Sequence, residues 1–162
     1  MSLDSDIRLL GSVQLFRGFQ VDHLRLLAFG AEKRFFRKEA RIYRQGTYSD
    51  GGYVLMSGTV QLVSGLNDTL ITTHRRGSLL AEMALISQTH HAASALVVED
   101  CEALKLPRPL FLRMLEEYPQ LAVVLQQRIG ESVGEFVGQL DRIRAKLEHA
   151  NDLVKRPPSR GS

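Results

Sequence analysis

The stretch that decides the fold is Gly77-Ser78-Leu79-Leu80-Ala81-Glu82-Met83-Ala84-Leu85, followed three residues later by Thr89-His90-His91-Ala92-Ala93-Ser94-Ala95. It combines a turn of small residues, a carboxylate at Glu82 and an ionisable side chain nine positions later at His91. These are the parts needed to hold a ribose hydroxyl and a phosphate. The stretch therefore indicates a cassette for a small phosphorylated ligand.

Further motifs follow one another on both sides of this cassette. Upstream lie Arg44-Gln45-Gly46-Thr47 and the segment from Tyr53 to Val60. Downstream lie the segments from Glu99 to Arg108 and from Phe111 to Ala122. Several separate motifs in this order are poorly explained by chance.

Over roughly residues 12 to 147, these motifs resemble the cyclic-nucleotide-binding domain of the cAMP receptor protein and FNR family. In this resemblance, residues 44–47 match a Gln-Gly-Asp turn and residues 53–60 match a strand, a turn and a strand. Residues 99–108 match the last strand of the family, and residues 111–122 match the helices that follow it. The pattern of that family is Phe-Gly-Glu-x-Ala-Leu, with Arg-Ala or Arg-Ser about nine positions later. This chain has Leu80-Ala81-Glu82-Met83-Ala84-Leu85 and then His91-Ala92. The frame is intact, but Ala81 replaces a glycine and His91 replaces the arginine.

The resemblance implies a role for each residue of the cassette. Glu82 matches the carboxylate that accepts a hydrogen bond from the ribose 2′-hydroxyl, and amides near Met83, Ala84 and Ala92 match those that point at the cyclic phosphate. His91 matches the arginine that pairs with that phosphate. The ligand-binding residues implied in this way are Ala81, Glu82, Met83, Ala84, His91 and Ala92.

Both departures from the family pattern are expected to weaken binding. Arginine carries a permanent charge on a planar fork, whereas histidine is shorter and mostly neutral above its ordinary pKa of about 6.5. Ala81 adds a methyl group where the backbone approaches the ligand or where a positive φ is needed. Ala92 lacks the hydroxyl that favours guanine in the family, so the expected ligand is cAMP and less readily cGMP.

The pattern along the chain predicts an α+β fold, an antiparallel β-roll or jelly roll (a double-stranded β-helix) between helices. Apolar residues at helical spacing predict short helices within residues 5–30, broken near Gly18, with Val13, Phe16, Leu24, Leu27 and Ala28 facing inward. The β-roll is expected at residues 33–106, with strands at 52–56, 60–63, 69–73 and 93–98. Helices are expected over 108–150, with a break at Pro119 between 110–118 and 120–150. This makes one domain, 1–150, and a basic, disordered tail, 151–162.

The long C-terminal helix is expected to form a homodimer. Its apolar positions are spaced 4, 3, 4, 3 and 4, as in the seam of a coiled coil. They are Ile129, Val133, Phe136, Leu140, Ile143 and Leu147. Beside this seam, Gly130, Gly134 and Gly138 form a small-residue ridge that either lets another backbone approach closely or makes the helix pliable, as a hinge.

Composition limits the other classes of function. The net charge is only +3, no run of about 18 apolar residues occurs, and the first residues are acidic, so a cytoplasmic protein without a membrane segment is expected. Cys101 is the single cysteine, which excludes an internal disulfide and a four-thiolate cluster and favours a buried thiol. The basic segment 33–44 is compatible with nucleic acid but is more typical of a solvated edge strand.

The sequence thus predicts a non-enzymatic sensor or regulatory domain with a weakened site for a cAMP-like ligand. It requires no cofactor and no metal, and, as given, it is not expected to read DNA directly. One alternative is a degenerate domain that acts as a scaffold for an unknown protein partner, and another is the N-terminal sensor fragment of a transcription regulator. A haem ligated by His74, His90 or His91 is disfavoured because no diagnostic spacing is present. Two bland interpretations also stay open, an exposed loop for the histidine pair His90 and His91 and satisfaction of Glu82 by turn amides.

Overall fold

A computed structural model describes residues 3–128 of the chain, and residues 3–125 within it form one compact unit. Its N-terminal part contains helix α1 (Leu3–Gly11), the short 3-10 helix η1 (Gln14–Phe16) and helix α2 (Val21–Gly30). The interruption between η1 and α2 includes Gly18, as the sequence predicts. The five residues expected to face inward are all buried, which confirms the helical spacing.

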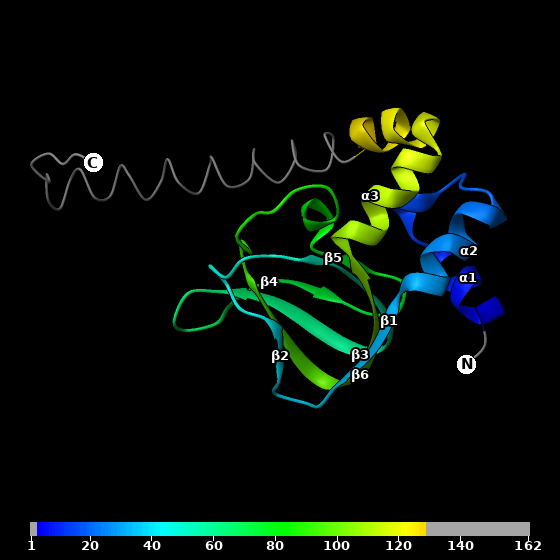
Figure 1. Cartoon of the computed structure of the whole chain (residues 1–162). Coiled ribbons are helices and arrows are strands. Elements are labelled where there is room, and N and C mark those ends of the chain that lie inside the picture. The colour runs from blue at the N-terminus through cyan, green and yellow to red at the C-terminus, as the bar shows by residue number, and fades with distance from the viewer. Residues whose placement is uncertain (1–2, 129–162) are drawn as a thin grey trace, which may run out of the picture. The chain divides into compact units, whose positions relative to one another are not determined.

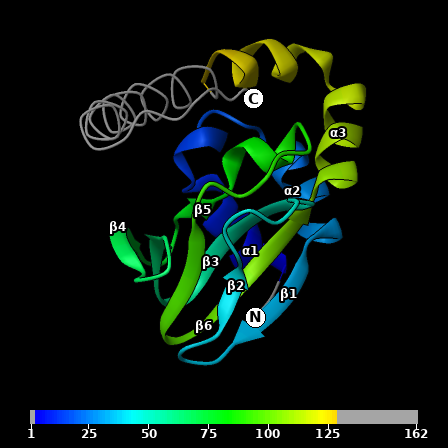
Figure 2. The same cartoon turned by 90° about the vertical axis from the view of Figure 1, so that its left-hand side faces the viewer.

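Within residues 3–128, the β-roll consists of six antiparallel strands (Figures 1 and 2). They are β1 (Glu32–Phe36), β2 (Arg41–Tyr43), β3 (Gly51–Ser64), β4 (Thr69–His74), β5 (Leu79–Leu80) and β6 (Ser94–Pro107). The order across the sheet is β1-β6-β3-β4, with β2 also pairing with β6 and β5 with β3. The long strands β3 and β6 thus form the centre of the roll, and the sequence prediction of this architecture is confirmed.

Two strand boundaries differ from the sequence prediction because β3 and β6 run on through irregular pairing. Residues 52–56 and 60–63, expected as separate strands, are parts of β3, whose register with β6 shifts around Gly58. Gly58 has φ +85°, and a Cβ there would lie 2.3 Å from the carbonyl oxygen of Asp100. Only glycine fits such a bulge, so the chain continues along β6 where a turn was expected. In the same way, β6 joins the strand expected at 93–98 to the final strand expected at 99–108, and it ends at Pro107.

The interior of the roll is apolar. Leu55, Val60 and Ala103 are fully buried there, together with the thiol of Cys101. Burial raises the pKa of Cys101 to about 11, so this thiol stays protonated and unreactive. The prediction of a buried cysteine is confirmed.

Helix α3 (Arg108–Glu117) joins the roll to the N-terminal helices, and Figure 1 shows α1, α2 and α3 gathered at one end of the sheet. Phe111 of α3 is fully buried, with its ring centroid 6.0 Å from that of Phe16. The helix starts two residues before the expected 110–118 because Pro109 is accommodated in its first turn. The break before Pro119 is confirmed, and residues 119–128 are helical.

The remainder of the expected helix lies outside the described residues. This holds for the dimer seam of Ile129, Val133, Phe136, Leu140, Ile143 and Leu147, and for Gly130, Gly134 and Gly138. Within residues 3–128, no helix is long and apolar enough to cross a bilayer.

The basic segment contains an edge strand, as the sequence favours. Among the described residues, strand β1 pairs with β6 alone, and most of its side chains are exposed. Two cations of the basic segment have local partners, since Arg34 pairs with Glu32 at 2.5 Å and the guanidinium of Arg37 lies 5.8 Å from the ring of Phe35. Charged side chains on such an edge oppose pairing with other sheets.

Candidate functional site

The cassette connects the short strand β5 to β6 on one side of the roll. Leu80 of β5 pairs with Tyr53 of β3, and the chain then forms the 3-10 helix η2 (Glu82–Leu85). Ala84 and Leu85 are buried beneath this helix and anchor it. Glu82 is half-buried in the first turn, where free amides favour a carboxylate.

Ala81 occupies a left-handed backbone conformation at the entry to η2, with φ +64° and ψ +49°. Its carbonyl oxygen accepts the hydrogen bond from the amide of Ala84 at 3.0 Å. Alanine is strained there because its Cβ approaches the following carbonyl. The sharp turn expected of a glycine is therefore kept by a residue that does not favour it.

His91 is buried, not exposed. Only 9% of its surface is accessible, and its ring stacks on Tyr43 with centroids 3.8 Å apart and planes 11° apart. Its amide donates to the carbonyl oxygen of Thr47 and its carbonyl oxygen accepts from the amide of Gly46, both at 2.8 Å. The backbone of His91 is thus paired with the Gln-Gly turn that precedes Tyr48.

The interpretation of His90 and His91 as an exposed loop pair, which the sequence left open, is correct for His90 and wrong for His91. His90 is exposed, with its ring centroid 4.3 Å from that of Tyr48. The side chains of successive residues in an extended segment point to opposite sides, so when His90 faces solvent His91 faces the roll. Ala92, the next residue, is exposed again.

Burial also decides the charge of the stacked pair. It lowers the pKa of His91, although the carboxylate of Asp50 acts in the opposite direction. Burial raises the pKa of the Tyr43 hydroxyl. Both rings are therefore neutral at neutral pH, and His91 does not supply a fixed positive charge.

Arg108 is a residue of the site that sequence reasoning missed. Its Nε donates to the carbonyl oxygen of Ala84, and its Nη2 donates to both the carbonyl oxygen and the Oγ of Ser49, each at 2.9 Å. The amide of Ser49 in turn donates a hydrogen bond to the carbonyl oxygen of Thr89 at 2.8 Å. Arg108 therefore fastens η2 and the loop before His91 to the start of α3.

A sequence signal for this role exists. A cation in the first turn of a helix faces the positive end of the helix dipole, which is unfavourable unless other groups bind it. Arg108 is such a residue, directly after Pro107. The position by itself indicates that its guanidinium serves acceptors outside α3.

The histidines considered for haem do not form a group. His74 lies on β4, where its Nε2 is 2.8 Å from Thr72 Oγ1, and burial lowers its pKa. His90 and His91 point apart on another segment. Across residues 3–128, no three His, Cys, Asp or Glu side chains are grouped in a way that could hold a metal ion.

The model of the cyclic nucleotide-binding domain matches residues 33–118, which run from β1 through the cassette to the end of α3. The chain belongs to the cyclic nucleotide-binding domain family. A solved structure, a cyclic nucleotide-binding-like protein from Brucella abortus, is 39% identical, with a TM-score of 0.63, and covers 70% of this chain and 99% of that one. The similarity thus extends over nearly the whole of that solved structure.

Curated relatives of the domain are longer proteins. The cyclic AMP receptor protein of Thermus thermophilus is 29% identical over 125 residues, or 73% of this chain and 58% of that protein. The lysophospholipase nte1 of Aspergillus oryzae is 26% identical over 113 residues, or 68% of this chain but 7% of that enzyme. The chain therefore spans less than two thirds of the length of either relative.

In this cyclic nucleotide-binding domain, the variant Ala81→Gly is expected to be more stable than the parent. The left-handed conformation costs alanine about 1–2 kcal/mol, and glycine loses about 0.5–1 kcal/mol more backbone entropy on folding. The net gain in the free energy of unfolding is about 0.5–1 kcal/mol, measured by urea denaturation. The matched control is Ala31→Gly, at φ −70°, which should lose stability. A loss at both positions would contradict the strain at Ala81.

The stability of the domain is expected to fall as the pH drops from about 7 to 5. Burial holds the pKa of His91 and of His74 below the ordinary value of 6.5. As the pH falls, these two imidazoles therefore bind protons more readily in the unfolded chain than in the folded chain. Their stabilising contribution is complete above that value and is lost below it. Urea unfolding at both pH values measures the difference. His91→Phe keeps a ring on Tyr43 and should reduce the pH dependence, and an unchanged slope in this variant would contradict the assignment.

Proposed function

We propose that this chain is a non-enzymatic sensor or regulatory domain that binds a cAMP-like nucleotide with weakened affinity. The observation that carries the proposal is the combination of a preserved cassette with a neutral, buried His91. The cassette keeps the left-handed turn at Ala81, the short helix η2 and the carboxylate of Glu82. It lacks a permanent cation at position 91, because burial lowers the pKa of His91. Shape and amides alone give an affinity lower than that of a site with an arginine.

The magnitude follows from the missing contact. A charge-assisted hydrogen bond contributes about 1.5–3 kcal/mol, or roughly 10- to 100-fold in affinity. Ala92 has no hydroxyl for a guanine amino group, so cAMP is the preferred nucleotide in this proposal. We further propose a cytoplasmic homodimer formed through the C-terminal seam, whose geometry a protein partner reads.

A second candidate, a protein-interaction scaffold, is favoured by one feature of His91. Its ring is already stacked on Tyr43, and its amide and carbonyl oxygen are already paired with the turn at residues 46–47. A site in which these groups are occupied has fewer free contacts for a ligand. In that case the domain keeps the fold and has lost the nucleotide.

Calorimetric titration of nucleotide-free protein with cAMP and cGMP, at pH 6 and at pH 8, separates the two candidates. A sensor binds cAMP more tightly than cGMP, and more tightly at the lower pH, because the phosphate favours protonated His91. Glu82→Ala should abolish this binding, whereas Glu116→Ala, on the exposed side of α3, should not affect it. Absence of both heat and thermal stabilisation at millimolar nucleotide would leave the scaffold.

A further inference from the structure

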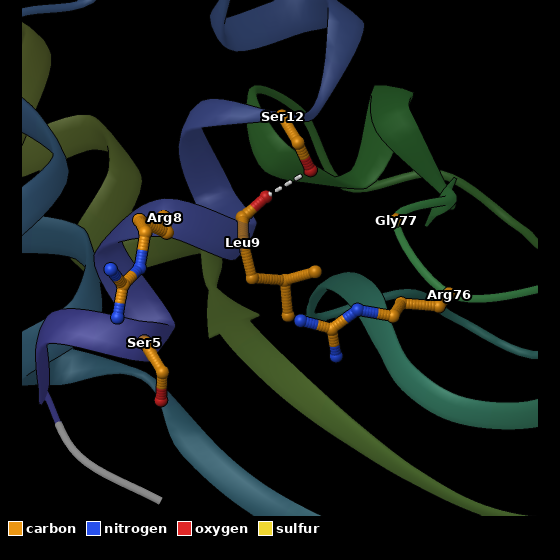
Figure 3. Close-up of a pocket in the computed structure, with 6 residues that line it drawn as sticks. All are labelled: Ser5, Arg8, Leu9, Ser12, Arg76 and Gly77. Atoms are coloured by element: carbon orange, nitrogen blue, oxygen red, sulfur yellow. Dashed lines mark hydrogen bonds between the residues drawn. The ribbon is translucent and has the colours of Figure 1, made fainter.

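A cavity outside the candidate ligand-binding residues 81–92 lies between α1 and the turn before β5, in which Gly77 begins the cassette stretch. Its volume is about 460 Å³, and Figure 3 shows its lining. The lining residues are Ser5, Arg8, Leu9, Ser12, Arg76 and Gly77. None of them belongs to the cassette residues 81–92, so the cavity is a second place where a small molecule fits.

The walls of this cavity are held by hydrogen bonds. Arg76 donates from Nη1 to the carbonyl oxygen of Met56 at 2.8 Å, and the amide of Gly77 donates to the carbonyl oxygen of Leu55 at 2.9 Å. On the other wall, Ser12 Oγ donates to the carbonyl oxygen of Leu9 at 2.6 Å. The turn is thus fixed to β3, and Figure 3 shows the guanidinium of Arg76 directed toward Leu9 on α1.

The charges around the cavity are all of one sign. Arg8 and Arg76 reach it from different elements, and no carboxylate lines it. Neither Arg8 nor Arg76 forms an ion pair with a described residue, in contrast to Arg25 and Arg41, which pair with Asp22 and Asp68. An anion bound in the cavity is attracted by both cations.

We propose that this cavity binds a small phosphomonoester through Arg8 and Arg76. The phosphate of a monoester carries about −1.5 to −2 charges at pH 7, which matches two cations better than the single charge of a cyclic phosphate. Guanidinium groups provide several donors each, and Arg76 uses one of them on Met56. The volume lies within the usual range for small-molecule sites and also accommodates the organic part of the ester.

Binding of ribose 5-phosphate, and separately of inorganic phosphate, to the full chain tests the proposal by calorimetry. If ribose 5-phosphate binds more tightly than inorganic phosphate, the cavity recognises both the phosphate and the organic part of the ester. If the two bind equally, the cavity recognises the phosphate group alone. Arg8→Gln and Arg76→Gln should each weaken binding about tenfold, and the double variant should not bind. If Arg76→Gln fails to fold because the hydrogen bond to Met56 is lost, Arg76→Lys replaces it in the test. Lysine keeps the positive charge, so this variant should retain part of the affinity.

The matched control is Arg25→Gln, which removes an arginine from α2, away from the cavity lining, and should leave the affinity unchanged. The cassette variant Glu82→Ala should also bind the ester normally, so failure of this proposal is distinguishable from failure of the nucleotide proposal. Absence of saturable binding, or an equal loss in Arg25→Gln, would overturn the assignment. Loss of binding in Glu82→Ala would transfer the ester to the cassette and overturn it as well.

Discussion

The variant His91→Arg is expected to bind cAMP about 10- to 100-fold more tightly than the parent, while its nucleotide-free form unfolds more easily. The gain arises because arginine restores a permanent charge and a planar fork for the phosphate oxygens. The loss arises because the side chain at this position is 9% exposed and stacks on a neutral tyrosine. A cation placed there without its anion is poorly solvated.

Two measurements on the same protein check this prediction. Calorimetry gives the affinity for cAMP, and thermal unfolding with and without cAMP gives the change in stability. The matched control is His90→Arg, which adds the same charge on the exposed neighbouring residue and should change neither quantity. Equal affinities of His91→Arg and the parent at neutral pH would contradict the proposal that the missing charge limits binding.

The variant Arg108→Ala is expected to lower the free energy of unfolding by about 2–4 kcal/mol. It removes three hydrogen bonds, to the carbonyl oxygen of Ala84 and to two oxygens of Ser49. These acceptors are part-buried, and leaving them without a donor costs more than the bonds contribute on average. Because Ala84 is in η2, the cassette should loosen along with the start of α3.

Urea unfolding measures this loss, and hydrogen exchange of the amides in residues 82–89 reports on the cassette directly. Arg113→Ala, on an exposed position of the same helix, is the control and should change stability by less than about 0.5 kcal/mol. Arg108→Lys should recover part of the stability, since a single ammonium reaches fewer of the three acceptors. A loss no greater than that of Arg113→Ala would show that Arg108 does not hold the cassette.

The strand pattern shows where reasoning from the sequence stops. Alternation and turn residues predicted the β-roll because each strand has one face in the core. The continuity of β3 through Gly58 was missed, since a glycine flanked by strand residues fits a turn and a bulge equally well. Only the position of Asp100 on β6, more than forty residues later, decides between them.

The cassette likewise has one feature that could be predicted from the sequence and one that could not. The need for an unusual backbone at Ala81 could be anticipated from the missing glycine, because a positive φ is a local property of the chain. The environment of His91 could not, because it depends on Tyr43, a residue 48 positions earlier that the roll brings within 3.8 Å. The sequence left the exposure of His90 and His91 open, and the tertiary structure separates them.

The sequence by itself indicated the family and the antiparallel β-roll with its flanking helices, and it predicted the cassette residues, because these rest on local spacing and on the periodicity of apolar side chains. The tertiary structure alone decided that His91 is neutral and stacked, that Arg108 fastens η2, and that Arg8 and Arg76 share a cavity. Burial, charge state and hydrogen-bond partners arise from residues distant in the chain. They become defined only when the roll closes and the helices pack at its end.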